Sequence, residues 1–274
     1  MADDTQLAIL KKSIAENNNC EFWNKWREYR PDTIINLSYA DLSHSNLTKA
    51  NLKKAFLREA KFVGSKLYKA NLEEANLEFA NLKDANLKKA NLSYANLKNA
   101  ILKKANLKKA NLKKANLSEA ILFKAKLTRS FLYKADLFFV KAQKSDFRKA
   151  ILRKTDFTDA DLSEALMSMV DLSRSNLSRA NLYKTSFIGA LLRKANLCYA
   201  NLDKTDFTGA YLGKANLNDS SLRKAIITRA YLIGADLKGT LLPISENEEL
   251  GLDALAEVAS EINKTAGATT KIRL

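Results

Sequence analysis

A large apolar residue recurs every five residues from Leu37 to Leu242, with no insertion. The motif is clearest in the segment "ANLKK", whose Leu we call position i. Position i is Leu in 34 of the 42 consecutive pentapeptides, and position i−2 is Ala in 29 of them. Position i−1 is mostly Asn or Asp, and positions i+1 and i+2 are mostly polar or charged. Such a repeat predicts similar structural units stacked on one another.

A period of five residues fits neither an α-helix nor a flat strand. On a helix, successive i positions would advance by about 140° and spread the leucines around every side. On a strand, an odd spacing would place them on alternate faces. Asn or Asp at every fifth residue favours turns. We therefore expect a chain that turns a corner every five residues, with i and i−2 pointing inward and i−1 pointing outward between them.

The exceptions to the motif indicate how many pentapeptides close one coil. If four do, residues twenty apart stack. Five of the eight residues other than Leu at position i then fall in one column: Phe147, Met167, Phe187, Phe207 and Ile227. A second column at i−1, interrupted by Asp171, contains Phe131, Ile151, Leu191, Tyr211 and Tyr231. A coil of fifteen residues would scatter both sets, so the sequence predicts a period of twenty.

The pattern A-[N/D]-L-x-x over residues 35–242 resembles the pentapeptide repeat family. The resemblance implies an all-β solenoid, the right-handed quadrilateral β-helix. At four pentapeptides per coil, the 42 copies fill about ten coils. Two segments depart from the pattern, "VKAQK" (140–144) and "ALMSM" (165–169), and we expect a bulge or a short distortion near either.

Open ends of such a rod expose unpaired backbone and core leucines, so we expect α-helical caps at both ends. Residues 1–34 read as a helical N-terminal cap of two short helices, which Pro31 ends. Phe22, Trp23, Trp26 and Tyr29 would cover the first coil; the alternative is a helix that binds a partner through these aromatics.

Residues 243–274 read as a C-terminal helix and tail. Ser245 and Glu248 form a capping-box pattern that opens a helix to about residue 264. We expect this helix to cap the last coil, and the alternative is pairing with another subunit. The final ten residues read as a flexible or loosely docked tail.

Composition and side-chain chemistry argue against catalysis. Cys20 and Cys198 form no disulfide framework, so a reducing cytoplasmic compartment is expected. We see no secretory signal and no membrane-spanning run. His44 has no second metal ligand at a suitable spacing, and no glycine loop suits phosphate. The sequence predicts no enzymatic activity, no metal, no cofactor and no small-molecule substrate.

The formal charge of +16 points to the outward positions as the functional surface. We name each side of the coil by its first leucine: Leu37, Leu42, Leu47 or Leu52. The Leu52 side carries the apolar column of Phe131 to Tyr231. Its candidate anion-binding residues are Lys114, Lys134, Lys154, Arg174, Lys194 and Lys214. We expect three basic sides and a nearly neutral Leu37 side.

Three functions remain open from the sequence. The first is a scaffold for protein–protein or self-association through the apolar column, because a line of large exposed residues suggests an interface. The second is electrostatic binding of nucleic acid or an anionic membrane surface through the basic sides. The third is a purely structural rod with solvated lysines. Some family members mimic DNA and protect type II topoisomerases, but that mechanism needs a negative surface.

Overall fold

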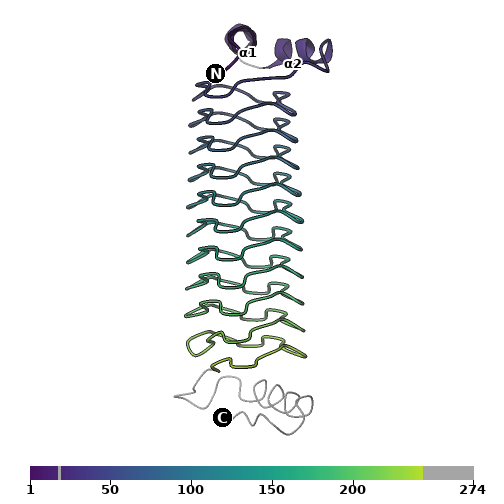
Figure 1. Ribbon diagram of the computed structural model, residues 1–274. Helices are drawn as coiled ribbons and strands as arrows, with labels where there is room; N and C mark the ends of the chain where they lie inside the picture. The colour runs from purple at the N-terminus through teal and green to yellow at the C-terminus, as the bar shows by residue number, and fades with distance from the viewer. Residues whose placement is uncertain (18–19, 243–274) are drawn as a thin grey trace.

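The computed structural model describes residues 1–17 and 20–242, and the repeats form a four-sided rod of stacked coils (Figure 1). Residues at i−1 form parallel bridges with the residues twenty positions later, as in Asn36↔Phe56 and Tyr211↔Tyr231. The predicted period of twenty residues is therefore confirmed. The β-structure consists of single bridges because the chain turns again before a longer strand can form.

Each corner is a four-residue turn that begins at position i. In the turn that begins at Leu107, the Ala110 N–H donates to the Leu107 carbonyl over 2.9 Å. The third residue, Lys109, has a φ of 58°. A positive φ at the third position is the pattern of a type II turn, which usually favours Gly or Asn. In this chain Lys, Glu, Asp, Phe and Tyr adopt it repeatedly at i+2.

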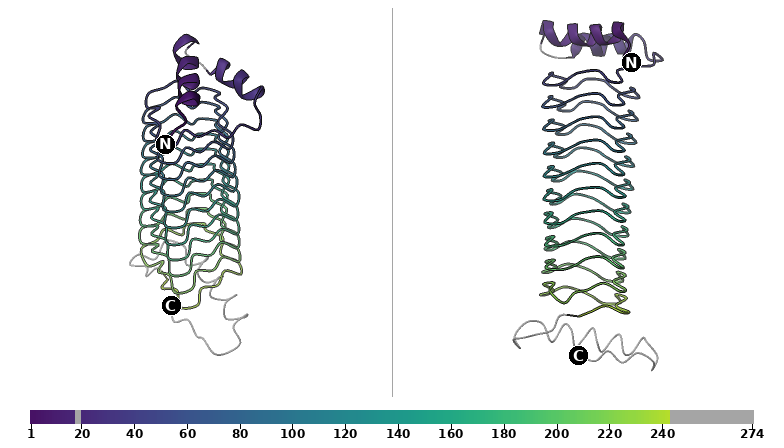
Figure 2. Two further views of the ribbon diagram at one scale, coloured as in Figure 1. Left: turned by 45° about the horizontal axis from the view of Figure 1, so that its top comes forward. Right: turned by 60° about the vertical axis from the view of Figure 1, so that its left-hand side comes forward.

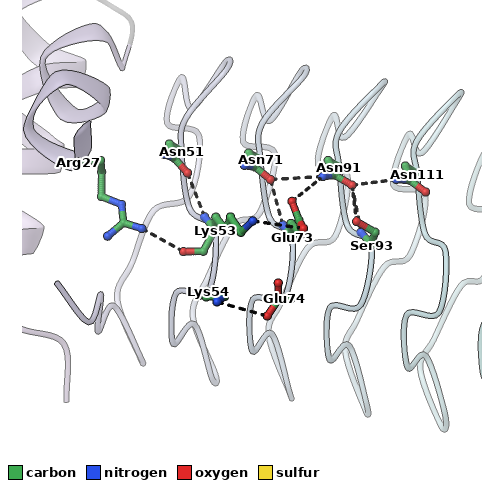
Figure 3. Close-up of polar contacts among 10 residues, drawn as sticks. All are labelled: Arg27, Asn51, Lys53, Lys54, Asn71, Glu73, Glu74, Asn91, Ser93 and Asn111. Atoms are coloured by element: carbon green, nitrogen blue, oxygen red, sulfur yellow. Dashed lines mark hydrogen bonds and ion pairs between the residues drawn. The ribbon is translucent and has the colours of Figure 1, made fainter. Parts of the chain in front are cut away.

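The Asn at i−1 is explained by two kinds of hydrogen bond. Asn111 accepts from the Lys113 N–H over 3.2 Å, which closes a local Asx turn. Its side-chain amide also donates to Asn91 Oδ1 over 3.0 Å, one coil earlier (Figure 3). Asn therefore stabilises the corner and links neighbouring coils with a single side chain.

The core is formed by the residues at i and i−2, as predicted. Along most of the rod these residues are fully buried, with Leu at i alternating with Ala or a small residue at i−2. Phe187 and Phe207 stack in the predicted column, with ring centroids 5.3 Å apart and planes 7° apart. The two departures from the motif lie inside this core without a bulge.

The expected distortion near 140–144 and 165–169 is wrong. Ala142 donates from its N–H to the Asp161 carbonyl over 2.8 Å, and Met167 donates to the Ser186 carbonyl over 2.8 Å. These are the ordinary bonds between coils. In the first segment Val140 and Ala142 exchange the usual large and small positions, and both remain fully buried. In the second, Leu166 at i−1 points outward and is 42% exposed.

Helices α1 (Asp4–Asn17) and α2 (Glu21–Glu28) lie over the first coil (Figure 2). Trp23 is buried and its ring stacks on that of Trp26, with centroids 5.3 Å apart. Phe22 and Tyr29 are exposed, so the prediction that all four aromatics cover the first coil is wrong for these two. At about 100° per residue, positions 22 and 29 point in nearly the same direction, about 100–120° away from Trp23.

Helix α2 also supplies hydrogen-bond partners to the edge of the first coil. Inside the rod, the carbonyl of an i−1 residue accepts from the preceding coil, as Asn71 does from the Leu52 N–H. The first coil has no predecessor. Its Asn51 carbonyl accepts from Trp23 Nε1 over 2.9 Å, and its Lys53 carbonyl accepts from the Arg27 guanidinium over 3.1 Å. The predicted C-terminal helix lies outside the described residues.

Candidate interaction surfaces

The apolar column of the Leu52 side forms one continuous ladder. Parallel bridges link Phe131 to Ile151, Leu191 to Tyr211, and Tyr211 to Tyr231, while Asp171 joins the two parts. The five apolar members are between 37% and 53% exposed. The Tyr211 and Tyr231 ring centroids lie 6.3 Å apart. The structure therefore brings all five predicted residues together on one exposed line.

This surface continues around the corner onto the Leu47 side, which the sequence analysis missed. Leu166, Met169 and Ile188 are 42%, 63% and 44% exposed there. At the corner itself, Gly189 and Gly209 present no side chain, and a Cβ at Gly209 would have no neighbour within 4 Å. We call this surface the apolar corner and define it by Leu166, Met169, Ile188, Gly189, Leu191, Gly209, Tyr211 and Tyr231.

A simple signal could have located the apolar corner. Reading position i+2 of the Leu47 side every twenty residues gives six cations, then Met169, Gly189 and Gly209, and finally Arg229. The cations are interrupted at the three positions that precede Asp171, Leu191 and Tyr211 in the adjacent i−1 column. The change in residue type at one position of the turn thus marks the start of a different surface.

The six candidate anion-binding residues of the Leu52 side are all exposed at i+2. Three of them contact aromatic rings. Lys114 Nζ lies 5.1 Å from the Tyr94 ring centroid, and Lys134 and Lys154 lie 5.6 and 5.9 Å from that of Tyr133. Cation–π contacts of this kind stabilise an exposed cation modestly. Arg174, Lys194 and Lys214 form no ion pair with any described residue.

The densest positive charge lies elsewhere, on the Leu47 side. Between residues 46 and 149 this side has eleven cations and one acid, Asp146. By contrast, the Leu37 side carries eight acids and four cations over the whole rod, so it is net acidic. Several of those acids are paired on the same side: Asp159 accepts from Arg179 over 2.7 Å, which lowers the pKa of that carboxyl.

The described residues contain no group of three His, Cys, Asp or Glu that could hold a metal ion. His44 is exposed, and Cys20 and Cys198 are both free thiols. Cys20 is buried at the N-terminal end of α2, and burial raises the pKa of its thiol to about 12. None of the helices in residues 1–17 and 20–242 has the length and apolar character needed to cross a membrane.

The family model for pentapeptide repeats matches this chain in overlapping segments that together run from residue 35 to residue 242. The chain therefore belongs to the pentapeptide repeat family, and its four-sided rod is a right-handed quadrilateral β-helix. No match was found among curated proteins.

Solved structures of other family members are similar to parts of this chain. HetL from the cyanobacterium Nostoc sp. strain PCC 7120, a protein involved in heterocyst differentiation regulation, is 30% identical. That match covers 83% of this chain and 98% of HetL, with a TM-score of 0.43. Rfr23 from the cyanobacterium Cyanothece 51142 is 25% identical over 37% of this chain and 63% of its own, with a TM-score of 0.26. QnrB1, a plasmid-mediated fluoroquinolone resistance protein, is 17% identical over 73% and 91%, with a TM-score of 0.29.

Proposed function

We propose that this protein is a non-catalytic interaction scaffold, which associates with a partner protein or with a second copy of itself through the Leu52 side. The observation that carries the proposal is the ladder of five large apolar side chains, each at least 37% exposed. Soluble monomers rarely expose a large apolar patch unless it forms an interface, and Asp171 is the one polar residue within this line. The two free cysteines suit a reducing compartment, and we place the protein in the cytoplasm.

The apolar corner extends the proposed interface. Gly189 and Gly209 leave the backbone uncovered between Ile188 on one side and Leu191 and Tyr211 on the next. A partner could therefore approach both sides closely at this edge. Tyr211 and Tyr231 combine a large apolar ring with a hydroxyl that stays in water, as is common at interfaces.

The test is Tyr211→Ser with Tyr231→Ser. We expect weaker association by sedimentation velocity and by pull-down from the native host, with an unchanged circular dichroism spectrum. Tyr39→Ser with Tyr199→Ser is the matched control, since these tyrosines are 52% and 63% exposed on the Leu37 side. The proposal fails if the wild type sediments as a monomer and retains no partner.

The proposal also assigns a capping role to α1 and α2 on a rod of about ten coils. Three contacts support it besides those of Trp23 and Arg27. Asn24 accepts from the Asn51 N–H over 2.8 Å, Gln6 accepts from the Asn36 N–H over 2.8 Å, and the Asp3 N–H donates to the Asn36 carbonyl over 2.8 Å. These groups belong to the open edge, which would otherwise be free to pair with another chain.

A further inference from the structure

The N-terminal half of the Leu47 side is a basic face with almost no compensating charge. We define the basic face by the eleven cations on this side between residues 46 and 149: Lys49, Lys66, Lys69, Lys88, Lys89, Lys108, Lys109, Lys126, Arg129, Arg148 and Lys149. Six of them occupy i+2 in six successive coils. Bridges such as Asn86↔Asn106 stack these coils directly, so the six cations span about 24 Å.

The cations of the basic face are unpaired within the described residues, with one exception. Arg148 donates to Asp146 over 2.9 and 2.7 Å, which raises the pKa of the guanidinium. No other member of the face lies within ion-pair distance of a described acid.

The neighbouring Leu52 side shows a different arrangement in the same coils. There Lys53 pairs with Glu73 over 3.3 Å and Lys54 with Glu74 over 3.7 Å (Figure 3). In the first two coils the chain therefore pairs positive charge on the Leu52 side and leaves it unpaired on the Leu47 side.

The backbone does not require cations at i+2. Glu59, Phe79, Asp84 and Asn99 adopt the same positive φ at this position on other sides. Like charges stacked one strand apart repel and reduce stability. Six in succession therefore have an electrostatic cost that other residue types would avoid, and a bound polyanion removes that cost.

We propose that the basic face binds the phosphate backbone of nucleic acid without reading its sequence. A straight array of cations matches a linear polyanion, and neutralised phosphates release counterions. Tyr68 is the one aromatic or large aliphatic side chain among the outward residues of this face, and Lys69 Nζ lies 5.5 Å from its ring centroid. The face thus has few aromatics on which bases could stack. It also has no apolar side chains to insert into a bilayer, which disfavours a membrane.

The test measures fluorescence anisotropy with labelled duplex DNA of two unrelated sequences, starting at about 50 mM salt. We expect equal affinity for both sequences and a steep loss of affinity with salt. Lys89→Glu, Lys109→Glu and Arg129→Glu together should lower the affinity by at least about tenfold and reduce the salt slope by about 2 to 3, since each lost phosphate contact contributes about 0.9. Glu residues already occupy i+2 in other turns, so the fold should tolerate this variant.

The matched control changes net charge equally on another side: Lys134→Glu, Lys154→Glu and Lys194→Glu. It should retain most of the affinity. Equal losses in both triple variants, or no salt-sensitive DNA binding by the wild type, would overturn the proposal. Binding to vesicles with anionic lipid but not to DNA would assign the face to a membrane instead. Lys89→Gln, Lys109→Gln and Arg129→Gln together should weaken binding less than the three changes to Glu at these positions.

This inference is independent of the scaffold proposal because it concerns a different surface. Tyr211→Ser with Tyr231→Ser should leave DNA binding unchanged. Conversely, the basic-face variant should leave association at the apolar corner unchanged. The two proposals can therefore fail separately.

Discussion

The indole nitrogen of Trp23 donates a 2.9 Å hydrogen bond to the backbone carbonyl of Asn51, at the edge of the first coil. Inside the rod the equivalent carbonyl accepts from the backbone of the coil before it. A side chain of α2 thus takes the place of a missing coil. Because each coil contacts only its neighbours, the effect of losing this bond should be confined to the N-terminal end.

We first predict that Trp23→Phe destabilises the first coils. The change keeps an aromatic ring but leaves the Asn51 carbonyl without its donor, at a cost of about 1–3 kcal/mol. Hydrogen exchange should accelerate at amides of the first coils and stay unchanged beyond residue 150. Phe22→Ala on the same helix is the control, since Phe22 is 44% exposed and should have little effect. Acceleration along the whole rod would contradict the nearest-neighbour account.

The second prediction concerns the buried thiol of Cys20, whose pKa is raised by burial to about 12 from an ordinary value near 9. A rise of three units lowers the thiolate fraction about a thousandfold. Alkylation of Cys20 in a Cys198→Ser variant should therefore be far slower than alkylation of Cys198 in a Cys20→Ser variant. Adding Arg27→Ala, which removes the bond to the Lys53 carbonyl, should accelerate the reaction of Cys20. No acceleration would mean that α2 does not protect this thiol.

The same shift has a definite sign in the pH dependence of stability. Above pH 9 the thiol ionises in the unfolded chain but stays protonated when α2 is docked. The unfolded state then binds fewer protons, so this group lowers the stability of the N-terminal end progressively between pH 9 and 12. Cys20→Ser removes that contribution. The thermal stability of the Cys20→Ser variant should therefore fall less than that of the wild type between pH 9 and 12.

How much the sequence predicts depends on the physical cause of each feature. The burial of i and i−2 followed from the apolar period, and the twenty-residue coil followed from columns such as Phe187 and Phe207. Both are features of the core, where the apolar or small character of a residue predicts that its side chain is buried. The exposure of Phe22 and Tyr29 was not predicted, because the number of aromatic residues in a helix does not say which side of the helix each one occupies.

The surfaces were predicted less completely. The column of Phe131 to Tyr231 was found because large apolar residues stand out among polar ones. The basic face was missed because lysine occurs at most outward positions. Its distinguishing property is that eleven cations share one side with a single acid, which appears only when the outward residues are sorted by side.

A third prediction tests the Asn ladder with Asn91→Asp. The Asn91 side chain accepts from Asn111 and the Ser93 N–H, and its amide lies 3.4 Å from a Glu73 carboxylate oxygen. The substitution keeps the acceptor but brings two carboxylates together, so it should cost about 1 kcal/mol or more at neutral pH.

Asn106→Asp is the matched control, because Lys88 occupies the position there that corresponds to Glu73. Urea unfolding should show a clearly smaller loss for this control. Equal losses would mean that the amide bonds between coils, and not the nearby acid, set the cost.

The last prediction compares glycine at two adjacent positions of one turn. Lys109 has a φ of 58°, a left-handed conformation that costs a residue with a side chain about 1–2 kcal/mol, and Gly does not bear this cost. Gly also has more backbone freedom to lose on folding, by about 0.5–1 kcal/mol. Lys109→Gly should therefore be neutral or slightly stabilising. Lys108→Gly removes the same charge one residue earlier, without relief of a positive φ, and should be destabilising. Urea unfolding of the two variants gives the comparison directly, and a greater loss for Lys109→Gly would show that its side chain stabilises the corner despite the strained backbone.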